Sequence, residues 1–95
     1  MSRKTEDTAI LERLIKVISR LLQTTRGEVA PIDRNQAKNL DIFDDLGLDS
    51  IETMDLLGMI ESEFDIKIAV ETVVGKNKIG EFEEIIQNYL QGSRL

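Results

Sequence analysis

Apolar residues recur at helical spacing in three parts of the chain. In the first part they form pairs three or four positions apart, separated mostly by charged and polar residues: Ile10-Leu11, Leu14-Ile15, Val17-Ile18 and Leu21-Leu22. This spacing places one apolar face along a helix, so it predicts an amphipathic helix over about residues 6–23. A long polar connection to about Asn39 follows, and the apolar residues at its acidic end are expected to pin it onto the core: Leu40, Ile42, Phe43 and Leu46.

A second helix is predicted from Asp49 to about Phe64. Asp49 stands three residues before Glu52, which is the arrangement of a capping box at a helix start. At about 100° per residue, one side of this helix collects the residues expected in the core: Thr53, Leu56, Leu57, Ile60 and Phe64. Ile51 and Met54 fall on the opposite side, beside acids, so they are expected to form an exposed apolar contact patch.

The remaining chain predicts an extended connection, a short helical turn over residues 70–74 and a last helix over about residues 80–91. That last helix carries a single apolar stripe: Phe82, Ile85, Ile86, Tyr89 and Leu90. The predicted fold is all-α, a small four-helix bundle of three main helices and a short third helix, with a long loop between helices one and two. Residues 1–95 should form one domain with flexible ends at 1–5 and 92–95.

Composition is that of a soluble globular protein, with 41% hydrophobic and 32% charged residues. No apolar run approaches the length that crosses a bilayer, and no targeting segment is visible at the N-terminus. We therefore expect a cytoplasmic, monomeric protein that does not insert into membranes.

Acidic residues are concentrated in one part of the chain. Residues 41–65 hold nine of the 18 acids and none of the 12 lysines and arginines. Most charge runs are simply solvated, but a block of one sign repels nucleic acid and favours partners with basic patches. We expect protein partners and no nucleic acid.

The chain has neither cysteine nor histidine, which removes thiolate nucleophiles, the commonest zinc ligands and the usual base for serine hydrolysis. Asp41 and Glu52 have the spacing of the first and last ligands of a calcium loop, but Phe43 and Leu46 occupy positions that need a ligand and a glycine, so no metal site is expected. Ser50 could simply help Asp49 to cap the helix. Alternatively, its hydroxyl could accept a phosphorus group at the helix N-terminus, where backbone N–H groups stabilise negative charge.

The segment Asp45-Leu46-Gly47-Leu48-Asp49-Ser50-Ile51-Glu52-Thr53-Met54-Asp55-Leu56, followed by Ile60-Glu61-Ser62-Glu63-Phe64, resembles the acyl carrier proteins. Those proteins share a Leu-Gly-x-Asp-Ser-Leu signature and an acidic recognition helix. The resemblance is strongest over residues 45–64, fair over 79–90, and extends elsewhere only through length and helix order.

The resemblance implies that a phosphopantetheinyl transferase attaches 4′-phosphopantetheine, taken from coenzyme A, to Ser50. The thiol of this arm would carry acyl groups as thioesters for fatty acid, polyketide or related lipid biosynthesis, and the chain itself would catalyse nothing. The implied partners are the transferase and the acyl synthetases, acyl transferases and synthases, docking through basic patches. The residues that match recognition positions are Asp49, Ile51, Glu52, Met54, Asp55 and Glu61.

Two departures from the family pattern suggest a specialised carrier. Gly58 stands where relatives often have a third apolar contact residue, and residues 69–78 are less acidic than usual and contain Lys76 and Lys78. An aminoacyl or peptidyl carrier stays an alternative, although such domains more often have Gly-Gly-x-Ser or Gly-Gly-His-Ser at the attachment turn. An unmodified helical adaptor that binds partners through Ile51 and Met54 is the second alternative.

Overall fold

The computed structural model describes residues 2–27 and 31–92, with side chains from residue 9 onward. Five helices occupy these residues: α1 (Ser2–Arg26), α2 (Arg34–Ala37), α3 (Ser50–Phe64), α4 (Val70–Val73) and α5 (Ile79–Gly92). The described residues contain no named strand, only an isolated bridge between Asp41 and Lys78. The predicted all-α fold is therefore confirmed.

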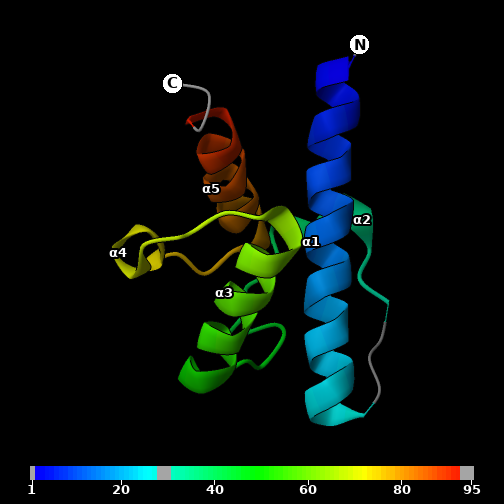
Figure 1. Cartoon of the computed structure of the whole chain (residues 1–95). Helices are drawn as coiled ribbons and strands as arrows, with labels where there is room; N and C mark the ends of the chain where they lie inside the picture. The colour runs from blue at the N-terminus through cyan, green and yellow to red at the C-terminus, as the bar shows by residue number, and fades with distance from the viewer. Residues whose placement is uncertain (1, 28–30, 93–95) are drawn as a thin grey trace.

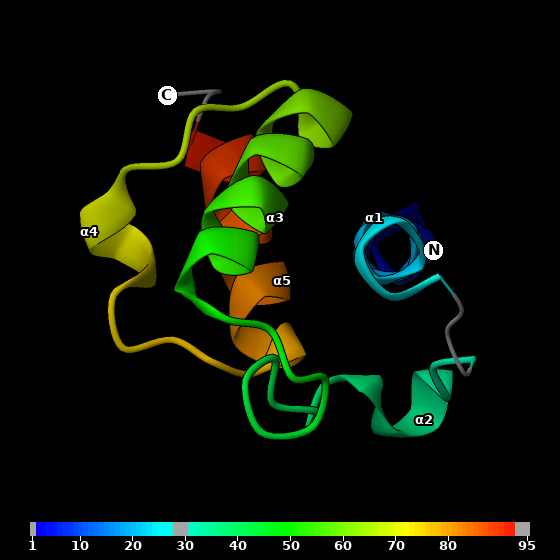
Figure 2. The same ribbon diagram turned by 90° about the horizontal axis from the view of Figure 1, so that it is seen from below.

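The helices α1, α3 and α5 form the body of the molecule, and α4 lies to one side against α5. Figure 1 shows α1 and α3 running in opposite directions, so the end of α1 and the start of α3 lie at the same end of the bundle. The view along α1 in Figure 2 shows α3 and α5 on one side of it, with α2 beneath. This arrangement places Ser50, the first residue of α3, at an end of the molecule.

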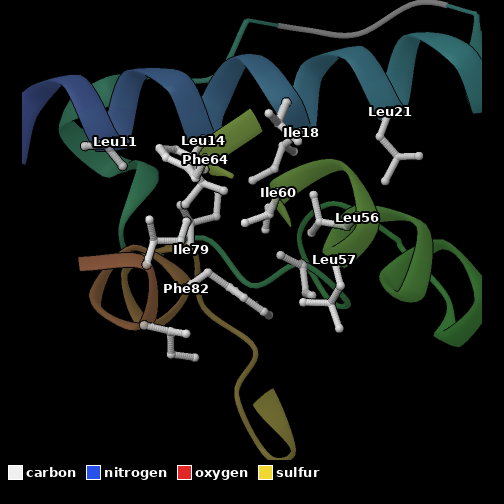
Figure 3. Packing of buried hydrophobic residues seen from close by; sticks show 14 of the residues in the cluster. Leu11, Leu14, Ile18, Leu21, Leu56, Leu57, Ile60, Phe64, Ile79 and Phe82 are labelled. Carbon is white, nitrogen blue, oxygen red and sulfur yellow. The ribbon is translucent and has the colours of Figure 1, made fainter. Parts of the chain in front are cut away.

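The core lies where the apolar faces of α1, α3 and α5 meet (Figure 3). The stripe predicted for the first helix is buried except for Ile15, which is partly buried, and in α3 the buried residues are Leu56, Leu57, Ile60 and Phe64. Phe82 and Ile79 close the core from α5. These side chains supply most of the hydrophobic stabilisation of a domain this small.

Helix boundaries depart from the predictions mainly around the first connection. α1 extends from Ser2 to Arg26, beyond the predicted 6–23, and the polar connection contains a short helix, α2, that the sequence pattern did not reveal. The side chain of Asp33 caps α2 by accepting a hydrogen bond from Asn35, and Ala37 is fully buried. Four residues are too few for apolar periodicity to show, which explains the omission.

Two predicted core positions were wrong or only partly right. Phe43 was expected to pin the loop with Leu40, Ile42 and Leu46, but it is 41% exposed. Ile42 is buried as predicted, Leu40 and Leu46 are partly buried against the core, and Leu48 adds a buried contact that was not predicted. Thr53 is only half-buried, and its hydroxyl donates to the carbonyl of Asp49. Of the ends expected to be flexible, residues 1 and 93–95 lie outside the described residues, whereas α1 already includes residues 2–5.

Candidate functional site

The capping box predicted at the start of α3 is present. The carboxylate of Asp49 accepts a hydrogen bond from the backbone N–H of Glu52 at 2.7 Å, and the carboxylate of Glu52 accepts one from the N–H of Asp49 at 3.1 Å. Ser50 stands between these two residues and is exposed. No described residue hydrogen-bonds its hydroxyl, because Asp49 already caps the helix. The hydroxyl is therefore free to react or to bind.

The turn before Ser50 is built on Asp41. One carboxylate oxygen of Asp41 accepts hydrogen bonds from the N–H groups of Phe43 at 2.7 Å and Asp44 at 2.9 Å, while the N–H of Asp41 donates to the carboxylate of Asp45 at 2.8 Å. These bonds hold the acidic chain in a compact turn. The N–H of Asp44 is the main cause that lowers the pKa of Asp41.

The same turn is attached to the segment between α4 and α5. The N–H of Ile42 donates to the carbonyl of Asn77 at 2.8 Å, and the side-chain amide of Asn77 donates to the carboxylate of Asp41. The carboxylate of Glu81 in turn accepts the N–H groups of Asn77 and Lys78, which lowers the pKa of Glu81. Together with the burial of Ile42 and Leu48, these bonds hold the chain segment before Ser50 against the segment that leads into α5.

Arg26, the last residue of α1, fixes the turn from the other side. Its guanidinium donates to both carboxylate oxygens of Glu52, at 2.9 and 3.1 Å, and to the carbonyl of Gly47 at 2.6 Å. Gly47 has φ of 74°, a conformation in which a side chain is strained. The hydrogen bond from Arg26 is the main cause that lowers the pKa of Glu52.

The six residues expected to recognise partners divide into two groups. Ile51 and Met54 are 74% and 54% exposed, and Asp55 on the same helix and its N-cap residue Asp49 are exposed as well. No described residue pairs with the carboxylate of Asp55.

Glu52 and Glu61 have carboxylates that are engaged within the molecule. Glu52 is bound by Arg26, and Glu61 accepts the N–H of Ile68 at 2.7 Å beyond the end of α3. Neither contact is visible in the sequence, because the partners lie outside α3.

A groove borders this surface between the end of α1 and the outer side of α3. Its volume is about 480 Å³, and its lining consists of Leu21 and Thr24 from α1 with Met54, Asp55, Gly58, Met59 and Ser62 from α3. We call it the α1–α3 groove. Gly58 contributes no side chain to this groove. The position where relatives often have a third apolar contact residue therefore lies in the groove lining.

The family model described as "Phosphopantetheine attachment site" matches residues 12–86 of the chain. The acyl carrier protein of Cyanophora paradoxa is 33% identical over 78 residues, which cover 80% of this chain and 75% of that protein. This chain belongs to the acyl carrier protein family. The resemblance read from residues 45–64 is therefore confirmed.

Ser50 lies within the matched segment. Its hydroxyl is exposed, and the N–H groups of Ser50 and Ile51, at the first positions of α3, have no acceptor within the helix. Unpaired N–H groups and the helix dipole stabilise an added negative charge by roughly 0.3–1 kcal/mol. Asp49 opposes that charge, whereas the charge of Glu52 is already balanced by Arg26.

Members of this family are carriers and not catalysts. Around Ser50 the structure places carboxylates, a guanidinium and apolar side chains. The described residues contain no group of acids that could hold a metal ion, and none of their helices is long and apolar enough to cross a membrane.

Proposed function

We propose that this protein carries acyl intermediates as thioesters on a 4′-phosphopantetheine arm attached to Ser50, in fatty acid, polyketide or related lipid biosynthesis. The observation that carries the proposal is the exposed hydroxyl of Ser50, free of internal hydrogen bonds at the start of α3. Membership of the acyl carrier family supports the chemistry, and the site geometry supports this particular serine.

In the proposed modification, Ser50 Oγ attacks the phosphorus that joins the arm to the nucleotide part of coenzyme A. A serine–phosphorus bond forms while the bond to the leaving adenosine bisphosphate breaks, and the hydroxyl proton passes to a base of the transferase. The described surroundings of Ser50 contain no imidazole and no thiol, so the partner enzyme supplies the proton acceptor. The bound arm supplies a thiol on which acyl groups are carried.

We propose that the transferase and the acyl-handling enzymes dock on the exposed side of α3. Ile51 and Met54 provide the apolar contact, and Asp49 and Asp55 provide charge for a basic partner surface. Glu52 and Glu61 add to the negative potential, but their carboxylates are held by Arg26 and by the N–H of Ile68. A small, salt-sensitive surface of this kind suits a carrier that must leave one enzyme for the next.

Mass spectrometry of the protein after incubation with coenzyme A and a promiscuous phosphopantetheinyl transferase tests the attachment. We expect one phosphopantetheine on the wild type and on Ser62→Ala, and none on Ser50→Ala. Ser62 is a matched control because it is an exposed serine on the same helix, three turns from Ser50. An unmodified wild type, or an adduct that survives Ser50→Ala, rejects the proposal and favours an unmodified adaptor.

The two departures in Gly58 and residues 69–78 support a specialised carrier. Loading of the modified protein from malonyl-coenzyme A by a fatty-acid-type malonyl transferase tests this point. We expect slow loading, and efficient loading followed by elongation would refute the specialisation. Loading by an amino-acid-activating enzyme in place of acyl-transferring enzymes would instead identify an aminoacyl carrier.

A further inference from the structure

Two arginines of α1 hold the two ends of α3. At the end of α3, Arg13 donates to the carboxylate of Glu63 at 2.9 Å and to the carbonyl of the same residue at 2.6 Å. At its start, Arg26 donates to the carboxylate of Glu52 and to the carbonyl of Gly47. Each arginine thus combines a carboxylate with a backbone carbonyl, so the two contacts are chemically alike.

The two contacts differ in what they hold. Arg13 binds a helix end whose backbone is already fixed by the buried ring of Phe64, over which the guanidinium lies at 4.4 Å. Arg26 binds Gly47 and Glu52, which stand on either side of Ser50 in the chain. It therefore joins both sides of the turn at residues 47–52, which contains Ser50, to the end of α1.

Glu52 links the contact with Arg26 directly to the helix cap. Its carboxylate accepts hydrogen bonds from both Arg26 and the N–H of Asp49, and its side chain is only 18% exposed. Isolated surface ion pairs contribute little because two mobile side chains must be ordered. Here the planar guanidinium donates to four oxygens, those of the Glu52 carboxylate, the Gly47 carbonyl and the Thr25 hydroxyl. The carboxylate is already held by the cap, so less freedom remains to be lost.

Reaction at Ser50 adds a negative charge beside Asp49 and Glu52. A carboxylate without a counter-charge at Glu52 would disfavour that product, and Arg26 removes this repulsion without occupying the serine hydroxyl. The same contact limits movement of the turn, which matters because transfer needs the hydroxyl aligned with the attacked phosphorus.

We propose that Arg26 is a positioning residue for modification of Ser50, acting through Gly47 and Glu52. The inference rests on the proposed function, since it concerns the reaction at that serine. Arg26 does not touch the reacting oxygen; it sets the position of the turn that carries it and balances the charge next to it.

Steady-state kinetics of phosphopantetheine transfer test the proposal, with Arg26→Met compared with Arg13→Met. Both substitutions keep an apolar stem and remove one guanidinium between α1 and α3. We expect kcat with saturating coenzyme A to fall about tenfold for Arg26→Met and to stay within twofold of wild type for Arg13→Met. Because removing a positive charge makes the chain more attractive to a basic transferase, KM for the carrier should stay equal or fall.

A second measurement is made on the unmodified protein, with no transferase present. Backbone ¹⁵N relaxation should show lower order parameters at Gly47, Leu48 and Ser50 in Arg26→Met and unchanged values in Arg13→Met. Arg26→Lys restores the charge but not the planar fork, so it should recover part of kcat and only part of the rigidity. It also serves as the test variant if Arg26→Met fails to fold.

The outcomes separate this inference from the proposed function. Equal kcat losses in the two methionine variants, an effect confined to a raised KM, or an unchanged turn in the relaxation data would overturn the role of Arg26. A wild-type chain that takes no phosphopantetheine would reject the proposed function itself, whatever the variants do.

Discussion

Replacing Gly58 with alanine should make the protein more stable. Gly58 lies in the middle of α3, and a Cβ built on it meets no atom within 4 Å. Glycine in a helix interior is less favourable than alanine by about 0.5–1 kcal/mol, because it loses more backbone freedom on folding. Since the site offers space and a helical backbone, the substitution should recover that amount.

For a domain of this size, 1 kcal/mol changes the melting temperature by roughly 4–8 °C. Gly58→Ala should therefore raise Tm by about 2–8 °C, as measured by circular dichroism, and raise the midpoint of urea unfolding without changing its slope. Gly47→Ala is the matched control. The added Cβ there meets only an Arg26 nitrogen at 3.7 Å, but φ of 74° should cost about 1–2 kcal/mol.

An unchanged or lowered Tm for Gly58→Ala would refute this reasoning, because it would mean that α3 is not a regular open helix at Gly58 in solution. Stabilisation would show that the natural chain keeps a less stable residue in the lining of the α1–α3 groove. That result would indicate that glycine is kept at this position for the shape of the groove and not for the stability of α3.

Three further predictions concern stability. Leu56 is fully buried, so Leu56→Ala should lower the free energy of unfolding, measured by urea titration, by about 2–5 kcal/mol. Met54→Ala, at an exposed position, should change it by less than about 0.5 kcal/mol. Equal effects of the two substitutions would contradict the burial of Leu56. The hydrogen bonds accepted by Asp41, Glu52 and Glu81 lower the pKa of each carboxylate in the folded state. As the pH falls, the unfolded chain therefore binds protons at these groups before the folded chain does. The stability that they contribute above about pH 4.5 should be lost as the pH falls through their folded-state pKa values. Urea midpoints that are unchanged between pH 6 and pH 3 would exclude this contribution. With a net charge of −6 and an acid block over residues 41–65, Tm should rise with added salt, and a Tm insensitive to salt or divalent ions would count against net repulsion.

The sequence alone predicted the main helices and the position of the candidate serine. The apolar pairs of α1, the Asp49–Glu52 capping box and the stripe of α5 are local patterns, repeated every three or four residues, and each reports directly on a helix. The same counting placed Ile51 and Met54 on the exposed side of α3, where the structure shows them. The short helix α2 was not predicted, because four residues complete barely one helical turn and show no periodic pattern.

Contacts between distant segments could not be predicted in this way. Arg26 meets Glu52 and Gly47 because α1 ends beside the start of α3, and Asn77 meets Asp41 because the segment before α5 packs against the turn that precedes α3. Sequence spacing carries no information about which of many acids a given arginine will reach. From the sequence alone, Glu52 and Glu61 were therefore expected to be free to contact partners, like the other acids of α3.

The chemistry proposed for Ser50 was inferred from residue types and local order: a serine after a capping acid, a glycine before it, and no thiol or imidazole anywhere in the chain. Tertiary structure alone decided which carboxylates are exposed without an internal partner and which are bound within the molecule. The physical reason is range, since helix formation depends on neighbours within four residues, whereas an ion pair depends on how whole helices pack.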